Sequence, residues 1–238
     1  MKIKTACLTD CGGRSVTDDT VRIHEDGDCV WACVGDGLGG YAGGRQASQA
    51  AGQALYEASR RGSLLTPERM NEAARQADEA VHALQREKGG KMKTTLVFLY
   101  IEDGRARWMH IGDSRLYHFS GGHLQCQTMD HSVSQMAVLM GEITPQEIRF
   151  HEDRNRVLRA LGGDNAKPDV SAPVILTGGK DVFLLCTDGF WEYVYEEEME
   201  KTLQTAKTPE QWLKSMEAIL RTRTPADSDN FTAAAVFC

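Results

Sequence analysis

Hydrophobic positions recur along the chain with two spacings, and each spacing predicts a different kind of element. Short apolar runs that end at glycine, aspartate or asparagine predict β-strands, whereas apolar residues three and four positions apart predict helices. Strands are expected at residues 2–9, 20–25, 29–34, 94–102, 105–111, 116–119, 123–128, 181–186 and 231–237. Helices are expected at residues 43–61, 67–88, 133–140 and 154–161, with a last helix after the capping box Thr208-Pro209-Glu210-Gln211.

The order of these elements predicts the class of fold. The first two helices follow one another directly, which argues against a regular alternation of strands and helices. Asp103-Gly104 separates two strands as a hairpin turn and favours antiparallel pairing. The polar region at 141–155 is typical of a mobile flap. Since no repeat or linker interrupts the pattern, we expect one α+β domain over residues 1–238.

Composition and charge narrow the class of protein. The chain has 238 residues, of which 41% are hydrophobic and 26% charged, as in ordinary globular proteins. Its net charge of −7 disfavours nucleic-acid binding. No apolar run approaches the ~18 residues of a membrane span, and the opening MKIKTACLTD lacks the apolar segment of a signal peptide. Seven cysteines, an odd number, are typical of reduced thiols, so we expect a cytoplasmic protein without a membrane or nucleic-acid partner.

The stretch VGDGLGGYAGG, residues 34–44, has the glycine spacing of a phosphate-binding turn between a strand and a helix. Glu57, about twenty residues further on, would complete a dinucleotide-binding pattern. Asp36 argues against that interpretation, because a carboxylate at the end of the strand repels an anionic pyrophosphate. The same geometry suits a hard cation, which glycine carbonyls and a short acid can approach closely.

Other aspartates also stand at the ends of expected strands. They are Asp18 and Asp19 before 20–25, Asp113 after 105–111, Asp188 after 181–186, and Asp227 and Asp229 before 231–237. Each acid alone is typical of a turn, but carboxylates gathered at one edge repel one another unless cations neutralise them. All-oxygen ligands favour Mg²⁺ or Mn²⁺. Two such ions ~3.5–4 Å apart can bridge and orient a water for attack on phosphorus, which predicts phosphate-ester hydrolysis.

Seven short motifs follow one another along the chain. They are Asp36-Gly37-Leu38-Gly39-Gly40, Thr94-Thr95, Gly112-Asp113-Ser114-Arg115, Asp130-His131-Ser132, RVLRALG at 156–162, LCTDG at 185–189, and Asp229-Asn230. In this order, and nearly end to end, the sequence resembles the metal-dependent protein phosphatases, also called protein phosphatase 2C, in their stand-alone bacterial form. The resemblance implies a sandwich of two mostly antiparallel β-sheets flanked by helices, with metal ions in a cleft at one edge.

The resemblance also implies which residues form the site. The expected centre holds two Mn²⁺ or Mg²⁺ ions, with a third, weaker ion in bacterial members. Its ligands by motif match are the bridging Asp36, Gly37 through its carbonyl, Asp188 and Asp229 on one ion, Asp18 or alternatively Asp19 on the other, and Asp113 on the third. Arg14 is expected to grip the substrate phosphate, because a guanidinium fork suits two phosphate oxygens.

Two departures from the family pattern concern the same site. The family arginine is followed after two residues by Asn-Glu-Asp or Asn-Gln-Asp, whereas Arg14 is followed by Ser-Val-Thr-Asp-Asp. Many eukaryotic members have a histidine, a proposed general acid, where this chain has Leu38. A metal-bound water could donate that proton instead. His131 could also replace the acid, although a histidine in a turn after a hairpin is typically structural.

The function implied by the resemblance is that of a serine/threonine phosphoprotein phosphatase. Direct attack of a metal-bridging water would hydrolyse phosphoserine and phosphothreonine in the substrates of a cognate serine/threonine kinase. Two alternatives remain open: a nucleotide-dependent oxidoreductase built on the glycine turn, and a catalytically inactive phosphatase-like binding module. The acids at Asp36, Asp188 and Asp229 weigh against the second alternative, because loss of such charges is the simplest route to inactivity.

Overall fold

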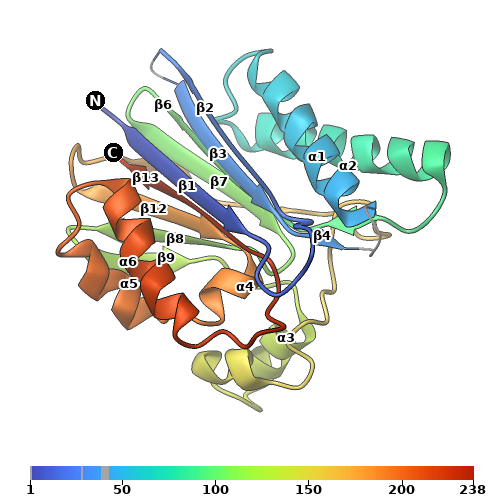
Figure 1. Cartoon of the computed structure of the whole chain (residues 1–238). Coiled ribbons are helices and arrows are strands. Elements are labelled where there is room, and N and C mark those ends of the chain that lie inside the picture. Colours follow the sequence, from blue (N-terminus) through green and yellow to red (C-terminus); the bar gives the residue numbers. More distant parts are fainter. Residues whose placement is uncertain (1, 28, 39–42) are drawn as a thin grey trace.

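The structure, a computed structural model, describes residues 2–27, 29–38 and 43–238 (Figure 1). Gly39 and Gly40 of the glycine motif lie outside the described residues. The strands are β1 (Lys4–Asp10), β2 (Thr20–Asp26), β3 (Cys29–Gly35), β4 (Gly37–Leu38), β5 (Lys93–Thr94), β6 (Leu96–Glu102), β7 (Arg105–Ile111), β8 (Arg115–Ser120), β9 (His123–Gln127), β10 (Asp169–Val170), β11 (Val174–Ile175), β12 (Asp181–Cys186) and β13 (Phe231–Phe237). The helices are α1 (Gly43–Ser59), α2 (Pro67–Lys88), α3 (Val133–Leu139), α4 (Asp188–Trp191), α5 (Glu196–Leu203) and α6 (Pro209–Arg221), with a 3₁₀ turn η1 (Pro145–Phe150).

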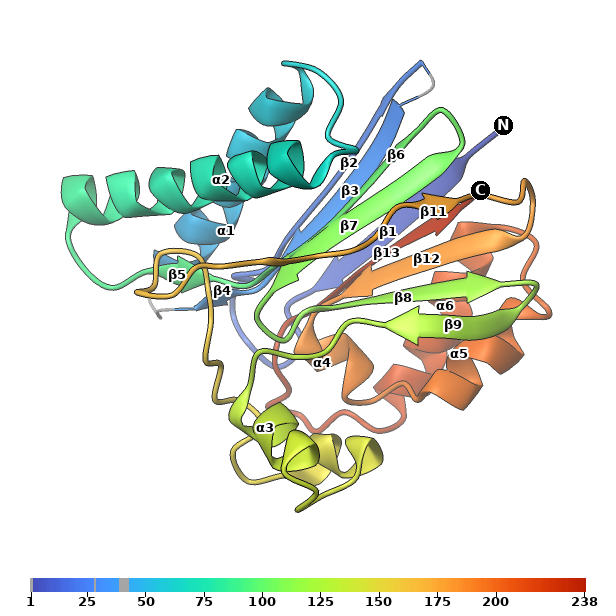
Figure 2. The same ribbon diagram turned by 180° about the vertical axis from the view of Figure 1, so that it is seen from behind.

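Two sheets form the centre of the molecule (Figure 2). One has the strand order β1-β13-β12-β8-β9, and the other has the order β10-β7-β6-β3-β2, with β11 also paired to β7. Throughout the described ranges, every strand pair is antiparallel. The predicted α+β class is therefore confirmed. The dinucleotide-binding alternative is wrong, because that fold is built from parallel βαβ units.

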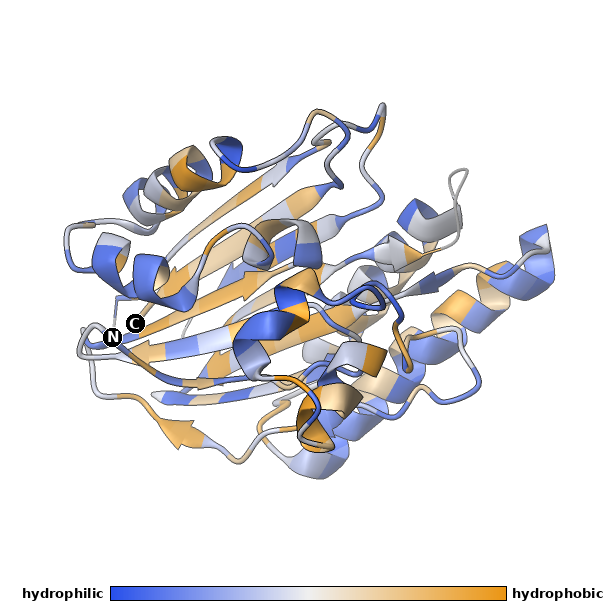
Figure 3. Ribbon diagram, turned by 90° about the horizontal axis from the view of Figure 1, so that it is seen from below, coloured by the Kyte–Doolittle hydropathy of each residue, from blue (hydrophilic) through white to orange (hydrophobic). Residues whose placement is uncertain are grey.

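Helices cover the outer faces of both sheets, with α1 and α2 beside one sheet and α5 and α6 beside the other (Figure 1). Alternate residues of a central strand belong to different cores: Ala233 and Ala235 pack toward α6, whereas Ala234 and Val236 pack against the opposite sheet. Because both faces of these strands are buried, their sequences are continuously apolar instead of alternating. Figure 3 shows these hydrophobic strands between the flanking helices.

The helix predicted at residues 154–161 is wrong. The segment contains no helix, and Leu161 forms a β-bridge with Thr94 instead. Leu161 is fully buried beside α1 and α2, whereas Leu158 is 52% exposed. The apolar spacing that suggested a helix therefore belongs to an irregular segment whose hydrophobic residues do not share one face.

Asp103 and Gly104 have φ values of 51° and 70°, as the predicted hairpin turn requires. All seven cysteines are free. Among the helices of the described ranges, none combines the length and the apolar character needed to cross a membrane.

Candidate metal centre

The antiparallel register brings several strand ends to one edge of the sandwich. Thr20 pairs with Gly35, which places the segment before β2 beside the segment after β3. Cys186 pairs with Ala233 of β13 and with Arg115 of β8, which places the end of β12 beside the starts of both neighbours. Acids precede or follow each of these ends, so residues far apart in the sequence share one small region.

Asp36 lies at the centre of a carboxylate cluster. Burial raises its pKa well above the usual value, and the neighbouring carboxylates of Asp188, Asp19, Asp113 and Asp229 raise it further. Burial, followed by neighbouring acids, also raises the pKa of Asp188 well above its usual range. Burial raises the pKa of Asp19 and of Asp113 to about 7. The fold thus gathers negative charge that protein groups do not neutralise.

Two oxygen atoms near this cluster lack a partner. Within the described part of the chain, Oδ1 of Asp18 and Oδ1 of Asp113 are buried and accept no hydrogen bond. A buried carboxylate oxygen without a partner is costly. Because the groups are all oxygen donors and carry excess negative charge, they fit divalent cations such as Mg²⁺ or Mn²⁺.

Thr94 and Thr95 hold the backbone of Asp36 in place. The N–H of Asp36 donates to Oγ1 of Thr95 at 2.9 Å, and its carbonyl accepts from the Thr95 N–H and the Thr94 hydroxyl, both at 2.9 Å. These contacts divide the strand that the sequence predicted at 94–102 into β5 and β6. The Thr95 hydroxyl also lies 2.7 Å from that of Ser114, so it links the support of Asp36 to the segment that carries the next acid.

Gly37 is packed so closely that no side chain fits there. A Cβ atom would lie 2.2 Å from the backbone carbon of Gly44 and 2.7 Å from the carbonyl oxygen of Asp18. Asp18 therefore lies beside Gly37, and its N–H donates to the side-chain oxygen of Asn230 at 2.7 Å. The Asn230 amide also donates to two carbonyl oxygens of the loop at 11–16. Asn230 thereby fastens this loop to the start of β13.

Thr187 positions Asp19 from the end of β12. Its hydroxyl donates to Oδ2 of Asp19 at 2.9 Å and accepts from the N–H of Thr232 at 3.0 Å. Asp19 is 7% exposed and has a hydroxyl partner, whereas Asp18 retains the unpaired oxygen described above. The two adjacent acids therefore occupy different environments.

Asp113 is supported by a buried network that the sequence analysis did not identify. The indole N–H of Trp191 donates to the carbonyl of Asp113 at 2.9 Å. The guanidinium of Arg115 lies over the Trp191 ring, 3.4 Å from its centroid, and forms two 2.7 Å hydrogen bonds with Asp130. Sequence motifs included Arg115 and Asp130, but only the folded contacts connect them to Trp191.

Arg14 lies at the exposed rim of the cluster. Its Nε is 3.5 Å from Oδ1 of Asp229, and the two side chains are 58% and 55% exposed. Asp229 is thus the most open acid of the group around Asp36. The guanidinium stands where an incoming anion can reach it from solvent.

His131 belongs to a separate group of side chains. The Gly112 N–H donates to its Nδ1 at 3.1 Å, and its Nε2 lies 3.2 Å from a carboxylate oxygen of Asp169. The ring stacks on His110 at 4.7 Å between centroids, and burial lowers the pKa of both histidines. These three side chains could hold a metal ion by proximity. Existing contacts occupy them, however, because Nε2 of His110 lies 2.7 Å from a backbone carbonyl and Arg159 lies 3.4 Å from both His131 and Asp169.

The raised pKa of Asp113 predicts the stability of a variant. Between pH 3.8, the ordinary pKa of an aspartate, and about pH 7, Asp113 is protonated in the folded protein but ionised in the unfolded chain. The contribution of Asp113 to the free energy of unfolding therefore falls as the pH rises through this range. Metal-free Asp113→Asn should therefore melt roughly 2–4 °C above wild type near pH 8, with a smaller difference near pH 5. Thermal unfolding in chelator measures both values. A lower melting temperature for the variant at both pH values would contradict the expectation.

Comparisons with known proteins agree with this arrangement. The protein phosphatase 2C family model matches residues 13–229, and the chain belongs to that family. It is 34% identical to the serine/threonine protein phosphatase PstP of Mycobacterium tuberculosis over 89% of this chain. It is 32% identical to the serine/threonine phosphatase stp of Listeria monocytogenes over 74% of this chain and 72% of that protein. The chain spans 42% of the length of PstP.

A solved structure extends the likeness to the whole fold. The catalytic domain of PstP in complex with two manganese ions superposes with a TM-score of 0.82, at 30% identity, over 99% of this chain and 97% of that one. The predicted sandwich of two antiparallel sheets flanked by helices is therefore confirmed.

Proposed function

We propose that this chain is a metal-dependent serine/threonine protein phosphatase whose residues 1–238 form one catalytic domain. The observation that carries the proposal is the crowding of carboxylates around Asp36, whose pKa is raised by burial and by four neighbouring acids. Family membership and the manganese complex of PstP support the same function. Retention of these acids argues against the inactive binding module.

The metal ligands follow from the donors that the cluster offers. Asp36 would be shared by two Mn²⁺ or Mg²⁺ ions; Asp18 and the Gly37 carbonyl would hold one, Asp188 and Asp229 would hold the other, and Asp113 would help to hold a weaker third. The unpaired oxygens of Asp18 and Asp113 support this assignment. Asp19, whose carboxylate accepts a hydrogen bond from Thr187, would support the neighbouring ligand Asp18 instead of holding an ion by itself. When bound, two such ions activate a water for direct attack on phosphorus and offset charge on the phosphoryl group.

The remaining residues concern substrate binding and the source of the proton for the leaving alkoxide. Arg14, exposed beside Asp229, presents a guanidinium fork that suits two phosphoryl oxygens. Leu38 has no proton to give, and both ring nitrogens of His131 lie close to other groups. We therefore assign no side chain as the proton donor for the leaving alkoxide.

The substrates in this proposal are phosphoserine and phosphothreonine proteins made by a cognate serine/threonine kinase. Seven free cysteines favour a reducing, cytoplasmic location. No nucleic-acid partner is expected for a chain with a net charge of −7.

Hydrolysis of p-nitrophenyl phosphate and of a phosphothreonine peptide tests the proposal. Both should be hydrolysed with Mn²⁺ or Mg²⁺ and neither in chelator, because the carboxylates alone repel the phosphate. A folded protein that hydrolyses neither substrate with either metal would favour the binding-module alternative instead.

A further inference from the structure

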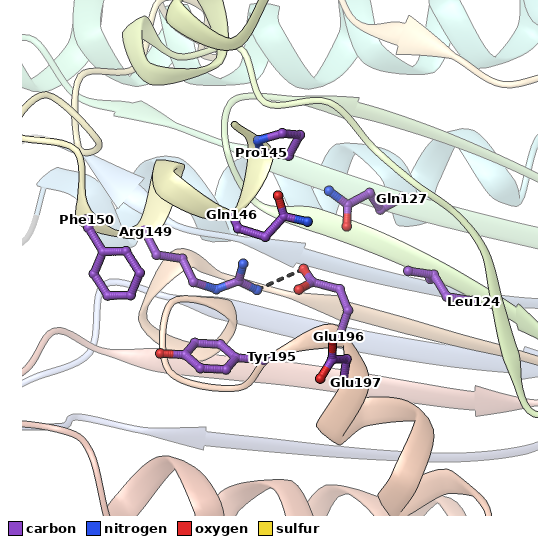
Figure 4. A pocket seen from close by; sticks show the side chains of 9 residues that line it. All are labelled: Leu124, Gln127, Pro145, Gln146, Arg149, Phe150, Tyr195, Glu196 and Glu197. Carbon is purple, nitrogen blue, oxygen red and sulfur yellow. Dashed lines mark hydrogen bonds and ion pairs between the residues drawn. The ribbon is translucent and has the colours of Figure 1, made fainter. Parts of the chain in front are cut away.

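A cavity of about 550 Å³ lies between β9, η1 and the start of α5 (Figure 4). Gln127, Gln146, Phe150, Tyr195 and Glu197 are among its lining residues. We call this cavity the η1 pocket. Its volume is within the usual range for ligand sites, and its wall combines aromatic rings with a few polar groups.

Buried anchors fix the wall formed by η1. Ile148 is 2% exposed and belongs to the core beneath α5 and α6. The Arg149 side chain is 5% exposed, and its guanidinium donates to the Trp191 carbonyl at 3.1 Å and to Glu196 at 2.8 Å. Because these contacts neutralise and occupy Arg149, the pocket does not offer a free cation to an anionic ligand.

The polar groups that remain available in the pocket are two amides and a carboxylate, all of which can accept hydrogen bonds. The side chains of Gln127, Gln146 and Glu197 make no hydrogen bond or ion pair with any described residue. Phe150 is 73% exposed beside them. The Tyr195 ring is already in contact with two cations, because the guanidinium groups of Arg223 and Arg149 lie 4.5 and 5.1 Å from its centroid. Glu197 lies in the first turn of α5, where a negative charge interacts favourably with the helix dipole. This role does not explain the exposed ring of Phe150 or the unpaired amides of Gln127 and Gln146.

A second cavity adjoins the η1 pocket. Arg149, Phe150 and Tyr195 also line this cavity of about 430 Å³, which Glu192 lines as well. The N–H of Glu192 donates to the carbonyl of Asp188 at 2.9 Å, one helical turn away. Besides burial, the Glu192 carboxylate also helps to raise the pKa of Asp188, so the second cavity lies near the cluster. We therefore expect that a side chain close in sequence to a phosphorylated residue at the cluster can reach the η1 pocket.

We propose that the η1 pocket binds an arginine side chain of the phosphoprotein substrate, close in sequence to the phosphorylated serine or threonine. The proposal rests on the phosphatase function proposed above. A planar guanidinium can stack on the exposed ring of Phe150 while it donates to Glu197 and to the two glutamine oxygens. Since Glu196 offsets Arg149, Glu197 leaves the pocket with a net negative charge that complements arginine.

Phosphothreonine peptides in which one arginine is moved along the sequence test the proposal. For at least one position, wild type should show a kcat/KM about tenfold higher than with the matching citrulline peptide, which keeps the shape and removes the charge. Glu197→Lys should abolish this preference and leave p-nitrophenyl phosphate hydrolysis unchanged. Glu87→Lys, which makes the same charge change on α2, should retain the preference.

Equal kcat/KM for arginine and citrulline at every position would overturn the proposal, and so would a preference that survives in Glu197→Lys. Fluorescence anisotropy in the presence of chelator measures binding of the peptides to the pocket without catalysis. Tighter binding of the arginine peptide to wild type than to Glu197→Lys supports the pocket even if hydrolysis fails. If hydrolysis is absent but the preference for binding the arginine peptide remains, the result contradicts the proposed phosphatase function and leaves the proposal for the η1 pocket standing.

Discussion

Replacing Asp36 with asparagine should lower kcat for p-nitrophenyl phosphate by roughly 1,000-fold or more at saturating Mn²⁺. Asp36 has the carboxylate that four other acids of the cluster surround, and its backbone is fixed by Thr94 and Thr95. Asparagine preserves the size of the side chain but removes its charge, so the variant loses the ligand proposed to lie between both ions. Steady-state kinetics over a range of Mn²⁺ concentrations measure the effect.

Two controls separate this loss from misfolding. Metal-free Asp36→Asn should melt at or above the wild-type temperature, because the substitution removes a buried charge from a crowded cluster. Asp103→Asn makes the same chemical change at another Asp-Gly turn, in the hairpin between β6 and β7, and should leave kcat unchanged. An Asp36→Asn variant that retains kcat within about tenfold of wild type would contradict a central role for this acid.

Replacing Asp130 with alanine should lower the free energy of unfolding by about 3–5 kcal/mol, because the buried Arg115 cation loses its bidentate partner and, among the described residues, keeps only Glu196, at 3.9 Å, as a neighbouring acid. Both side chains of this pair are 2% exposed, and two hydrogen bonds of 2.7 Å join them. Arg115 also stacks on Trp191, whose indole holds the carbonyl of Asp113. Denaturant unfolding monitored by circular dichroism measures the change in free energy.

The double variant Arg115→Met, Asp130→Leu tests whether the unpaired charge causes the loss. It should be more stable than Asp130→Ala, because apolar side chains of similar size replace both charges. Glu72→Ala breaks an ion pair on the exposed surface of α2 and should have little effect. Equal losses for Asp130→Ala and Glu72→Ala would show that the buried pair does not stabilise the fold.

The sequence predicted those parts of the fold that depend on local patterns. Continuous apolar runs located the central strands, and the capping box Thr208-Pro209-Glu210-Gln211 located α6. The helix expected at 154–161 failed because apolar spacing does not distinguish a helix from an irregular segment whose side chains point to different surroundings. Leu161 is buried and Leu158 is exposed, and this difference depends on contacts with distant segments.

The candidate site also has parts that the sequence predicted and parts that it did not. Acids at the ends of strands can be recognised from the sequence, because Asp36 and Asp188 each follow an apolar run. Their supports could not be recognised, since the bond from Trp191 to Asp113 and the bond from Thr187 to Asp19 join residues that only the fold brings together. A tryptophan in a short helix has many structural roles, and its sequence context alone does not single out this one.

If the crowded acids form a centre for two divalent ions, the stoichiometry of Mn²⁺ binding should show it. Isothermal titration of the metal-free protein near pH 7.5 should give about two ions per chain for wild type, with weaker binding of a third. Asp188→Asn should lose at least one tight site while retaining its fold by circular dichroism. Absence of Mn²⁺ binding by folded wild type, or the same stoichiometry and affinity in Asp188→Asn, would show that these acids do not form a two-metal centre.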